Sequence, residues 1–77
     1  MKNHGYYEPT NGFIERHKLH IDEAETWVEL SGEGSRKLLY DKEDGQISLI
    51  DDFDIIVFQG YLPSEEALEN VIAYTNW

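Results

Sequence analysis

Two acidic and aromatic segments contain the residues whose chemistry stands out in this chain. The first places Glu25, Trp27 and Glu29 at alternate positions, and the second is the run 51–54, Asp-Asp-Phe-Asp. Alternate residues of a strand point to the same face, so two carboxylates would flank an indole. Aromatic anchors inside a charged rim are typical of protein–protein interfaces. The predicted partner-binding residues are Glu25, Trp27, Glu29, Asp51, Asp52, Phe53 and Asp54.

Histidines and acids also raise the question of a metal site. On an extended strand His17 and His20 point to opposite faces, which leaves only His20 and Asp22 together. A zinc site usually needs three or four protein ligands. The acidic turn before Gly45 lacks the spacing of a calcium-binding loop. The sequence therefore predicts neither a metal nor another cofactor.

Catalytic motifs are missing from the sequence as well. The chain has no cysteine, and its serines lie outside any nucleophile-elbow pattern. The segment Gly32-Glu33-Gly34 lacks the third glycine, the lysine and the following helix of a phosphate-binding loop. Paired carboxylates are no evidence of acid–base catalysis in a chain with sixteen acidic residues, because such pairs arise anywhere in it. A glycosidase also needs a cleft between its carboxylates, and 77 residues are too few to build one. We expect a protein that is not an enzyme, with a minimal metal-dependent enzyme using His17 and His20 as one alternative.

Charge is the strongest signal in the composition. Sixteen acidic residues against six basic ones give a net charge of −10. The first twenty residues hold three basic and two acidic side chains, so the excess of acids falls in residues 21–77. An acidic surface repels phosphates and anionic lipids, which argues against direct binding of nucleic acid or membrane. Such a surface is attracted to basic surfaces instead.

A chain of 77 residues has room for one domain, and its hydrophobic patterns indicate which class. Residues 1–11 lack periodicity and are expected to form an irregular arm, held down by Tyr6 and Tyr7, ahead of a single domain at 12–77. Period-two alternation predicts strands at about 12–21, 25–30, 36–41, 46–50 and 54–58. The last of these is almost continuously apolar, so we expect it to be covered on both faces or to lie centrally.

The C-terminal segment has the pattern of a helix at about 64–76. Ser64 is a good N-cap, and acidic residues follow it where the helix dipole favours them. The apolar stripe has helical spacing and consists of Leu68, Val71, Ile72 and Thr75. The sequence therefore predicts an α+β fold, an antiparallel sheet of four to five strands in a meander with one C-terminal helix packed on a face.

Together these features indicate a small acidic protein that docks on the basic surface of a partner, such as a nuclease or nucleoprotein complex, as a charge mimic of nucleic acid. Viral inhibitors of host defence nucleases and immunity proteins against toxic nucleases also use acidic surfaces to dock on basic ones. The comparison with them is an analogy between classes of protein and rests on no family resemblance. The alternative is an accessory or structural module that pairs through a sheet edge, as a homodimer or a subunit.

Two further features bear on where the protein works. No apolar stretch approaches the roughly 20 residues of a membrane span, and no apolar signal segment follows Lys2. Because cysteine is absent, a reducing compartment suits the chain. We therefore expect a cytoplasmic protein, in the host cytoplasm if it is viral.

Overall fold

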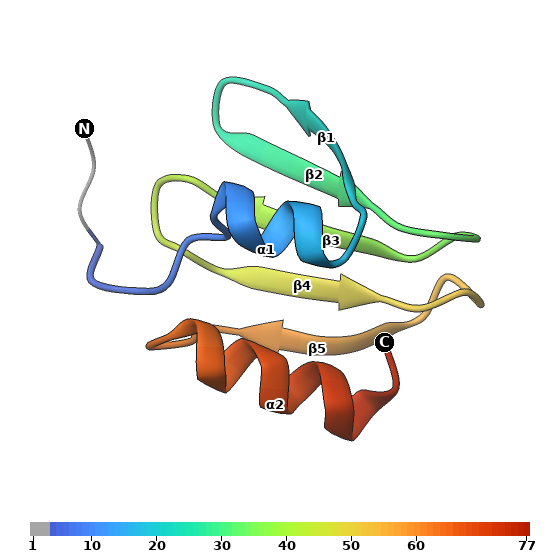
Figure 1. Cartoon of the computed structure of the whole chain (residues 1–77). Coiled ribbons are helices and arrows are strands. Elements are labelled where there is room, and N and C mark those ends of the chain that lie inside the picture. The colour runs from blue at the N-terminus through green and yellow to red at the C-terminus, as the bar shows by residue number, and fades with distance from the viewer. Residues whose placement is uncertain (1–3) are drawn as a thin grey trace.

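Five antiparallel strands lie side by side in the order in which they occur along the chain (Figure 1). The computed structural model describes residues 4–77. Its elements are α1 (Asn11–Arg16), β1 (His20–Glu23), β2 (Trp27–Ser31), β3 (Lys37–Asp41), β4 (Ile47–Ile50), β5 (Ile56–Gly60) and α2 (Glu65–Thr75). The predicted fold class, an α+β domain with an antiparallel meander and a C-terminal helix, is confirmed.

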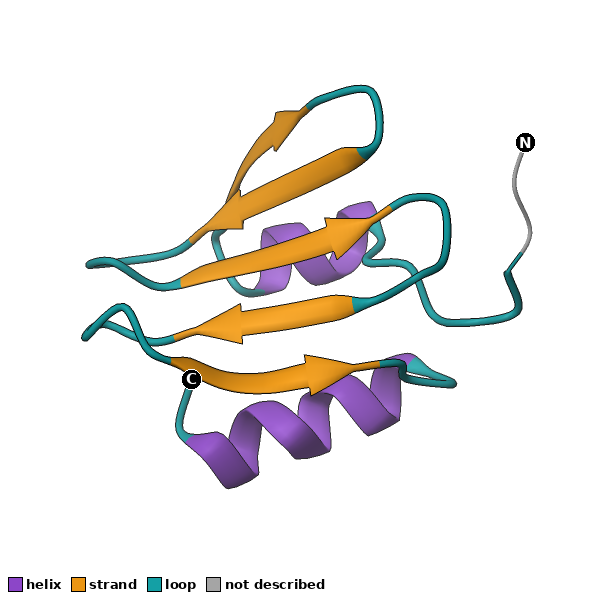
Figure 2. Ribbon diagram, turned by 180° about the vertical axis from the view of Figure 1, so that it is seen from behind, coloured by secondary structure: helices purple, strands orange, loops and turns teal. Residues whose placement is uncertain are grey.

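The core lies on one face of the sheet, beneath the two helices. In Figure 1 α1 passes in front of β3, and in the reverse view of Figure 2 it lies behind the sheet. One cluster contains the buried apolar side chains of residues 4–77, which are Phe13, Val28, Leu30, Leu38, Tyr40, Ile47, Leu49, Leu62, Leu68 and Trp77. Alternate residues of β2, β3 and β4 enter this cluster, so the residues between them point to the uncovered face.

A helix replaces the first half of the strand predicted at 12–21, and only β1 is extended. The Thr10 hydroxyl caps α1 by accepting a hydrogen bond from the Phe13 amide at 3.2 Å. Phe13 is fully buried, and its ring centroid lies 4.5 Å from that of His17, one turn later. Lys18 follows with a φ of 54°. The period-two interpretation was wrong here because the cap and the buried Phe13 determine the local structure.

The apolar run at 54–58 also lies elsewhere than expected. It contributes to β5, which is at an edge of the sheet and pairs with β4. Ile55 and Ile56 are exposed, so the expectation of cover on both faces or a central position was wrong. The pairing register shifts at Leu49 and Ile50, a bulge of the kind found at sheet edges. Both views place α2 alongside β5, so a helix flanks this edge (Figures 1 and 2).

The predicted C-terminal helix is present as α2. Its N-cap is Ser64, whose hydroxyl accepts a hydrogen bond from the Ala67 amide at 3.2 Å. Leu68 is fully buried, and Val71 and Ile72 pack against the core, as the spacing predicts. This stripe attaches the helix to the sheet.

An irregular arm leads into α1, and it is held against the segment that follows β5. Residues 1–3 of the predicted arm lie outside the described residues. The Tyr7 amide donates to the carbonyl of Leu62 at 2.7 Å. The Tyr6 ring packs on Tyr61 with their centroids 5.0 Å apart. These contacts of Tyr6 and Tyr7 hold the arm against the rest of the domain.

Gly45, in the β3–β4 hairpin, has a φ of +87°. A Cβ at this position would lie 2.7 Å from Nδ1 of His4, whose Nε2 is hydrogen-bonded to the Tyr40 hydroxyl at 2.8 Å. We expect Gly45→Ala to lower the free energy of unfolding by about 1–2 kcal/mol, because an L-residue is strained in this region. Urea unfolding measures the loss.

Gly12→Ala is the matched control for Gly45→Ala. Gly12 lies in α1, and a Cβ there would meet nothing closer than 3.8 Å. This change is expected to be neutral or to stabilise by up to about 1 kcal/mol, because alanine has the higher helix propensity. Equal destabilisation by both changes would contradict the positive-φ turn.

The buried phenol of Tyr40 makes the fold sensitive to alkali. Burial, and then the nearby Glu8 carboxylate, raises the pKa of Tyr40. In the unfolded chain this phenol ionises near pH 10, so its contribution to stability is complete below about pH 10 and is lost as the pH rises further. We expect Tyr40→Phe to flatten the alkaline decline of the unfolding free energy, measured by urea titration. Tyr74→Phe, at an exposed ring, is the control and is expected to keep the wild-type decline.

Candidate functional site

The uncovered face of the sheet carries the residues that alternate with the core positions. Cross-strand pairs align into one row, in the order Asp22, Glu29, Leu39, Ser48 and Gln59. Trp27 lies in the adjacent row, opposite Asp41. The Trp27 side chain is large and hydrophobic, yet the residue is 42% exposed. An indole therefore stands beside carboxylates on a face that no helix covers.

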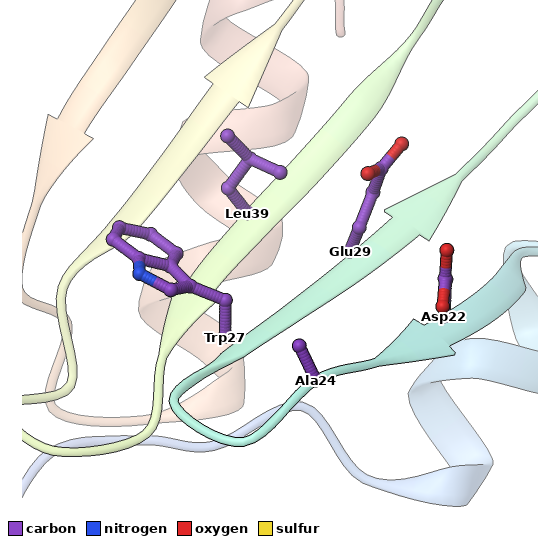
Figure 3. A pocket seen from close by; sticks show the side chains of 5 residues that line it. All are labelled: Asp22, Ala24, Trp27, Glu29 and Leu39. Carbon is purple, nitrogen blue, oxygen red and sulfur yellow. The ribbon is translucent and has the colours of Figure 1, made fainter.

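A shallow hollow of about 320 Å³ opens on this face (Figure 3). Its lining consists of Asp22, Ala24, Trp27, Glu29 and Leu39. These side chains stand on the viewer's side of the strands in Figure 3, and the helices lie behind the sheet. Three of the five are apolar, and the other two are acidic. The hollow therefore combines an apolar surface with negative charge.

The first predicted group is only partly assembled. Trp27 and Glu29 lie on one face of β2, as alternation predicts, and both line the hollow. Glu25 instead lies in the turn before β2, which the Ala24 amide closes by donating to the Trp27 carbonyl at 2.7 Å. Asp22, Ala24 and Leu39, which the sequence interpretation left out, complete the lining. The strand pairing of Asp22 with Glu29, once predicted, would have identified the first of these.

The second predicted group lies at the other end of the sheet, in the loop between β4 and β5 (Figure 1). Asp51 accepts hydrogen bonds from two amides of its own loop, including that of Phe53 at 2.9 Å. Asp52 accepts one from the Ser35 amide at 3.2 Å. Phe53 is 80% exposed, and Asp54 has a φ of 64°. These carboxylates organise two loops, and the fold does not bring them to Trp27.

Ion pairs are distributed unevenly over the molecule. Among residues 4–77, five of the sixteen acids lie within ion-pairing distance of a basic side chain, namely Glu8, Glu23, Glu29, Glu65 and Glu69. Arg16 on α1 contacts two of these, both on α2, so the covered side is cross-linked by charge. On the uncovered face the Nζ atom of Lys37 lies 3.9 Å from the Oε2 atom of Glu29. Asp22 and Asp41 have no such partner in the described chain, so this face keeps its negative charge.

No protein family, curated protein or solved structure matches the chain. Geometry and charge are therefore the basis for inferring its function.

Two kinds of feature were sought in the part of the chain that the structure describes, a group of metal ligands and a membrane-spanning helix. Within it, no three His, Asp or Glu side chains are grouped so as to hold a metal ion. His17 is the C-cap of α1 and His20 begins β1, so the strand-parity relation expected between them was wrong. His17 Nε2 lies 2.9 Å from a Glu69 carboxylate oxygen. Residues 4–77 also contain no helix that combines the length and the apolar character of a membrane span.

The facing carboxylates of Asp22 and Glu29 are expected to cost stability. Like charges directly opposite each other on antiparallel strands destabilise a sheet. We therefore expect Asp22→Asn to raise the free energy of unfolding by about 0.2–1 kcal/mol at low ionic strength. The gain should shrink at about 1 M salt, where the Debye length falls to roughly 3 Å. Thermal unfolding at the two salt concentrations measures both effects.

Glu15→Gln is the control for Asp22→Asn, because it removes the same charge from α1, on the covered side. Glu15 is exposed and has no ion-pair partner among the described residues. A stabilisation equal to that of Asp22→Asn would show that only the net charge matters.

Proposed function

We propose that this domain is a protein-binding inhibitor that docks its uncovered sheet face on a basic surface of a partner protein, in the place of nucleic acid. The observation that carries the proposal is the half-exposed Trp27 beside Asp22 and Asp41, two carboxylates without ion-pair partners in the described chain. Large aromatic side chains supply most of the affinity of protein interfaces. Unneutralised charge around them speeds association and selects a partner of opposite sign.

The turns next to Trp27 add to the negative charge of this face. Glu25 lies in the turn before β2, and Glu43 and Asp44 lie in the β3–β4 hairpin at the same end of the sheet (Figure 1). None of these three has an ion-pair partner within residues 4–77. The surface that docks is thus the uncovered face together with these turns.

The alternative, assembly through a sheet edge, has less support from the geometry. α2 flanks β5 at one edge, and β1 at the other edge is only four residues long. Asp22 and Glu23 place two charges on that short strand. Short, charged or covered edges are the features that prevent edge-to-edge pairing. Face docking is therefore the better-supported mode.

The test compares two triple variants of equal net charge against a panel of purified basic nucleases. The first neutralises the face through Asp22→Asn, Glu29→Gln and Asp41→Asn. The second neutralises exposed acids elsewhere through Glu15→Gln, Glu33→Gln and Glu66→Gln. Affinity by calorimetry is expected to fall at least about tenfold for the face variant, equal to roughly 1.4 kcal/mol, and little for the control.

Two further readouts accompany the affinities. Wild-type binding is expected to weaken as salt rises and to compete with nucleic acid for the nuclease. Equal losses in the two variants, or binding that is insensitive to salt, would reject docking through this face.

A further inference from the structure

We propose that the hollow beside Trp27 receives one arginine side chain of the partner protein. This inference depends on the proposed function and specifies the chemistry that the uncovered face recognises. The occupant follows from three properties of the lining, which are its apolar wall, its paired carboxylates and its exposed indole.

The apolar wall suits the aliphatic part of a long basic side chain. Ala24, Trp27 and Leu39 provide hydrocarbon and ring surface in a hollow of about 320 Å³. Arginine and lysine bury their methylene groups along such surfaces while the charged end remains in a polar environment. A negatively charged or small polar side chain would gain nothing from this wall.

The two carboxylates face each other across the β1–β2 pair. Asp22 and Glu29 are direct cross-strand partners, so their Cβ atoms lie about 4.5–5.5 Å apart. Lys37 lies 3.9 Å from Glu29, and Asp22 has no ion-pair partner in residues 4–77. A cation placed between the carboxylates would relieve their repulsion. The guanidinium group of arginine carries five donors in a planar fork and can bond both carboxylates at once.

The indole completes the selection of arginine. A guanidinium group stacks on an aromatic face through its plane and its charge. The molecule contains this arrangement elsewhere, because the guanidinium carbon of Arg36 lies 5.1 Å from the ring centroid of Trp77. Trp77 is buried, whereas Trp27 is exposed and its indole borders the hollow. The position of Trp27 leaves room for a guanidinium group from another protein.

The experiment titrates the full chain with three blocked tripeptides, acetyl-Gly-X-Gly-amide, in which X is arginine, citrulline or lysine. Proton–nitrogen NMR reports on the two indole N–H groups separately. With arginine we expect a saturable shift of the NMR signals of the Trp27 indole N–H and of the Asp22, Glu29 and Leu39 amides. The signal of the Trp77 indole N–H is expected to stay unchanged. Citrulline, which has the same shape without the charge, is expected to bind at least about tenfold more weakly. Lysine is expected to bind more weakly than arginine because it lacks the planar fork.

Variants show whether the lining is responsible. Asp22→Asn and Glu29→Gln should each weaken arginine binding several-fold, and Trp27→Leu should weaken it while preserving apolar bulk. Glu15→Gln, on the covered side, should bind as the wild type does. The proposal is overturned by the absence of a saturable shift, by equal binding of citrulline or lysine, or by equal losses in Glu15→Gln.

The outcome separates this inference from the proposed function. If the peptides fail while the face variant still loses affinity for its nuclease, the face docks but the hollow takes no arginine. If the face variant binds its nuclease as tightly as its control does, the proposed function fails, whatever the peptides show.

Discussion

Trp77→Ala is expected to lower the free energy of unfolding by about 3–5 kcal/mol, the typical cost of deleting a buried tryptophan. Trp77 is 3% exposed, and its indole Nε1 donates to the carbonyls of Lys37 at 3.0 Å and Ile50 at 2.8 Å. These residues are paired across β3 and β4, so the indole joins the two strands at one end of their ladder. Its loss would leave a cavity and two carbonyls without this donor.

This loss is large for a chain of this size. A 77-residue domain is expected to have a total stability of about 4–12 kcal/mol. The loss is therefore about a quarter of the total stability or more, and urea titration followed by circular dichroism should show a correspondingly lower unfolding midpoint. Trp27→Ala removes the same side chain from an exposed site, so its cost is expected to stay below about 1 kcal/mol. Similar losses in the two variants would contradict the assignment of Trp77 to the core.

Phe13→Ala is expected to cost about 3–5 kcal/mol as well, because Phe13 is fully buried and connects α1 to the sheet. Amide exchange should rise most across α1, because Phe13 is the buried side chain that attaches this helix to the sheet. Equilibrium unfolding and hydrogen exchange measure these two effects.

Phe53→Ala is the matched control for Phe13→Ala, since Phe53 is 80% exposed in the β4–β5 loop. Its unfolding free energy should remain within about 0.5 kcal/mol of the wild type. If Phe53→Ala proved the more damaging change, α1 would not be part of the core.

Local patterns were sufficient to predict the meander and α2. Val28 and Leu30 alternate with exposed or half-exposed neighbours along β2, and period-two spacing is a direct sign of a strand with one buried face. Ser64 and the stripe from Leu68 to Ile72 combine a cap with helical spacing, two independent signs of the same helix. Gly45 has the positive φ that its Asp-Gly turn predicts.

The short helix and the edge position of β5 were beyond these patterns. α1 has six residues, fewer than two turns, so its period cannot be distinguished from alternation, and the Thr10 cap was the available sign. An apolar run such as 54–58 indicates burial in general. Its neighbours are decided by tertiary packing, here by α2 alongside β5.

The site shows the same division between local and long-range information. The alternation of Trp27 and Glu29 places them on one face without any knowledge of the fold. Asp22 joins them only through the register of β1 on β2, and Leu39 only through that of β3. Carboxylates at 51–54 resemble a binding surface in sequence, yet they lie in the β4–β5 loop, at the opposite end of the sheet from Trp27. Composition alone does not tell which acidic segment lies beside the exposed indole.

The cover of the core comes from two helices that lie far apart in the sequence, and this has a consequence for the order of folding. Hairpins between successive strands form within microseconds, because their contacts are local. Contacts between α1 and α2 need a much longer loop to close, since Arg16 and Glu69, for example, lie 53 positions apart. We therefore expect the rate-limiting step of folding to join hairpins before both helices cover the apolar face of the sheet. Substitutions at Trp77, which attaches the end of α2, should then mainly raise the unfolding rate.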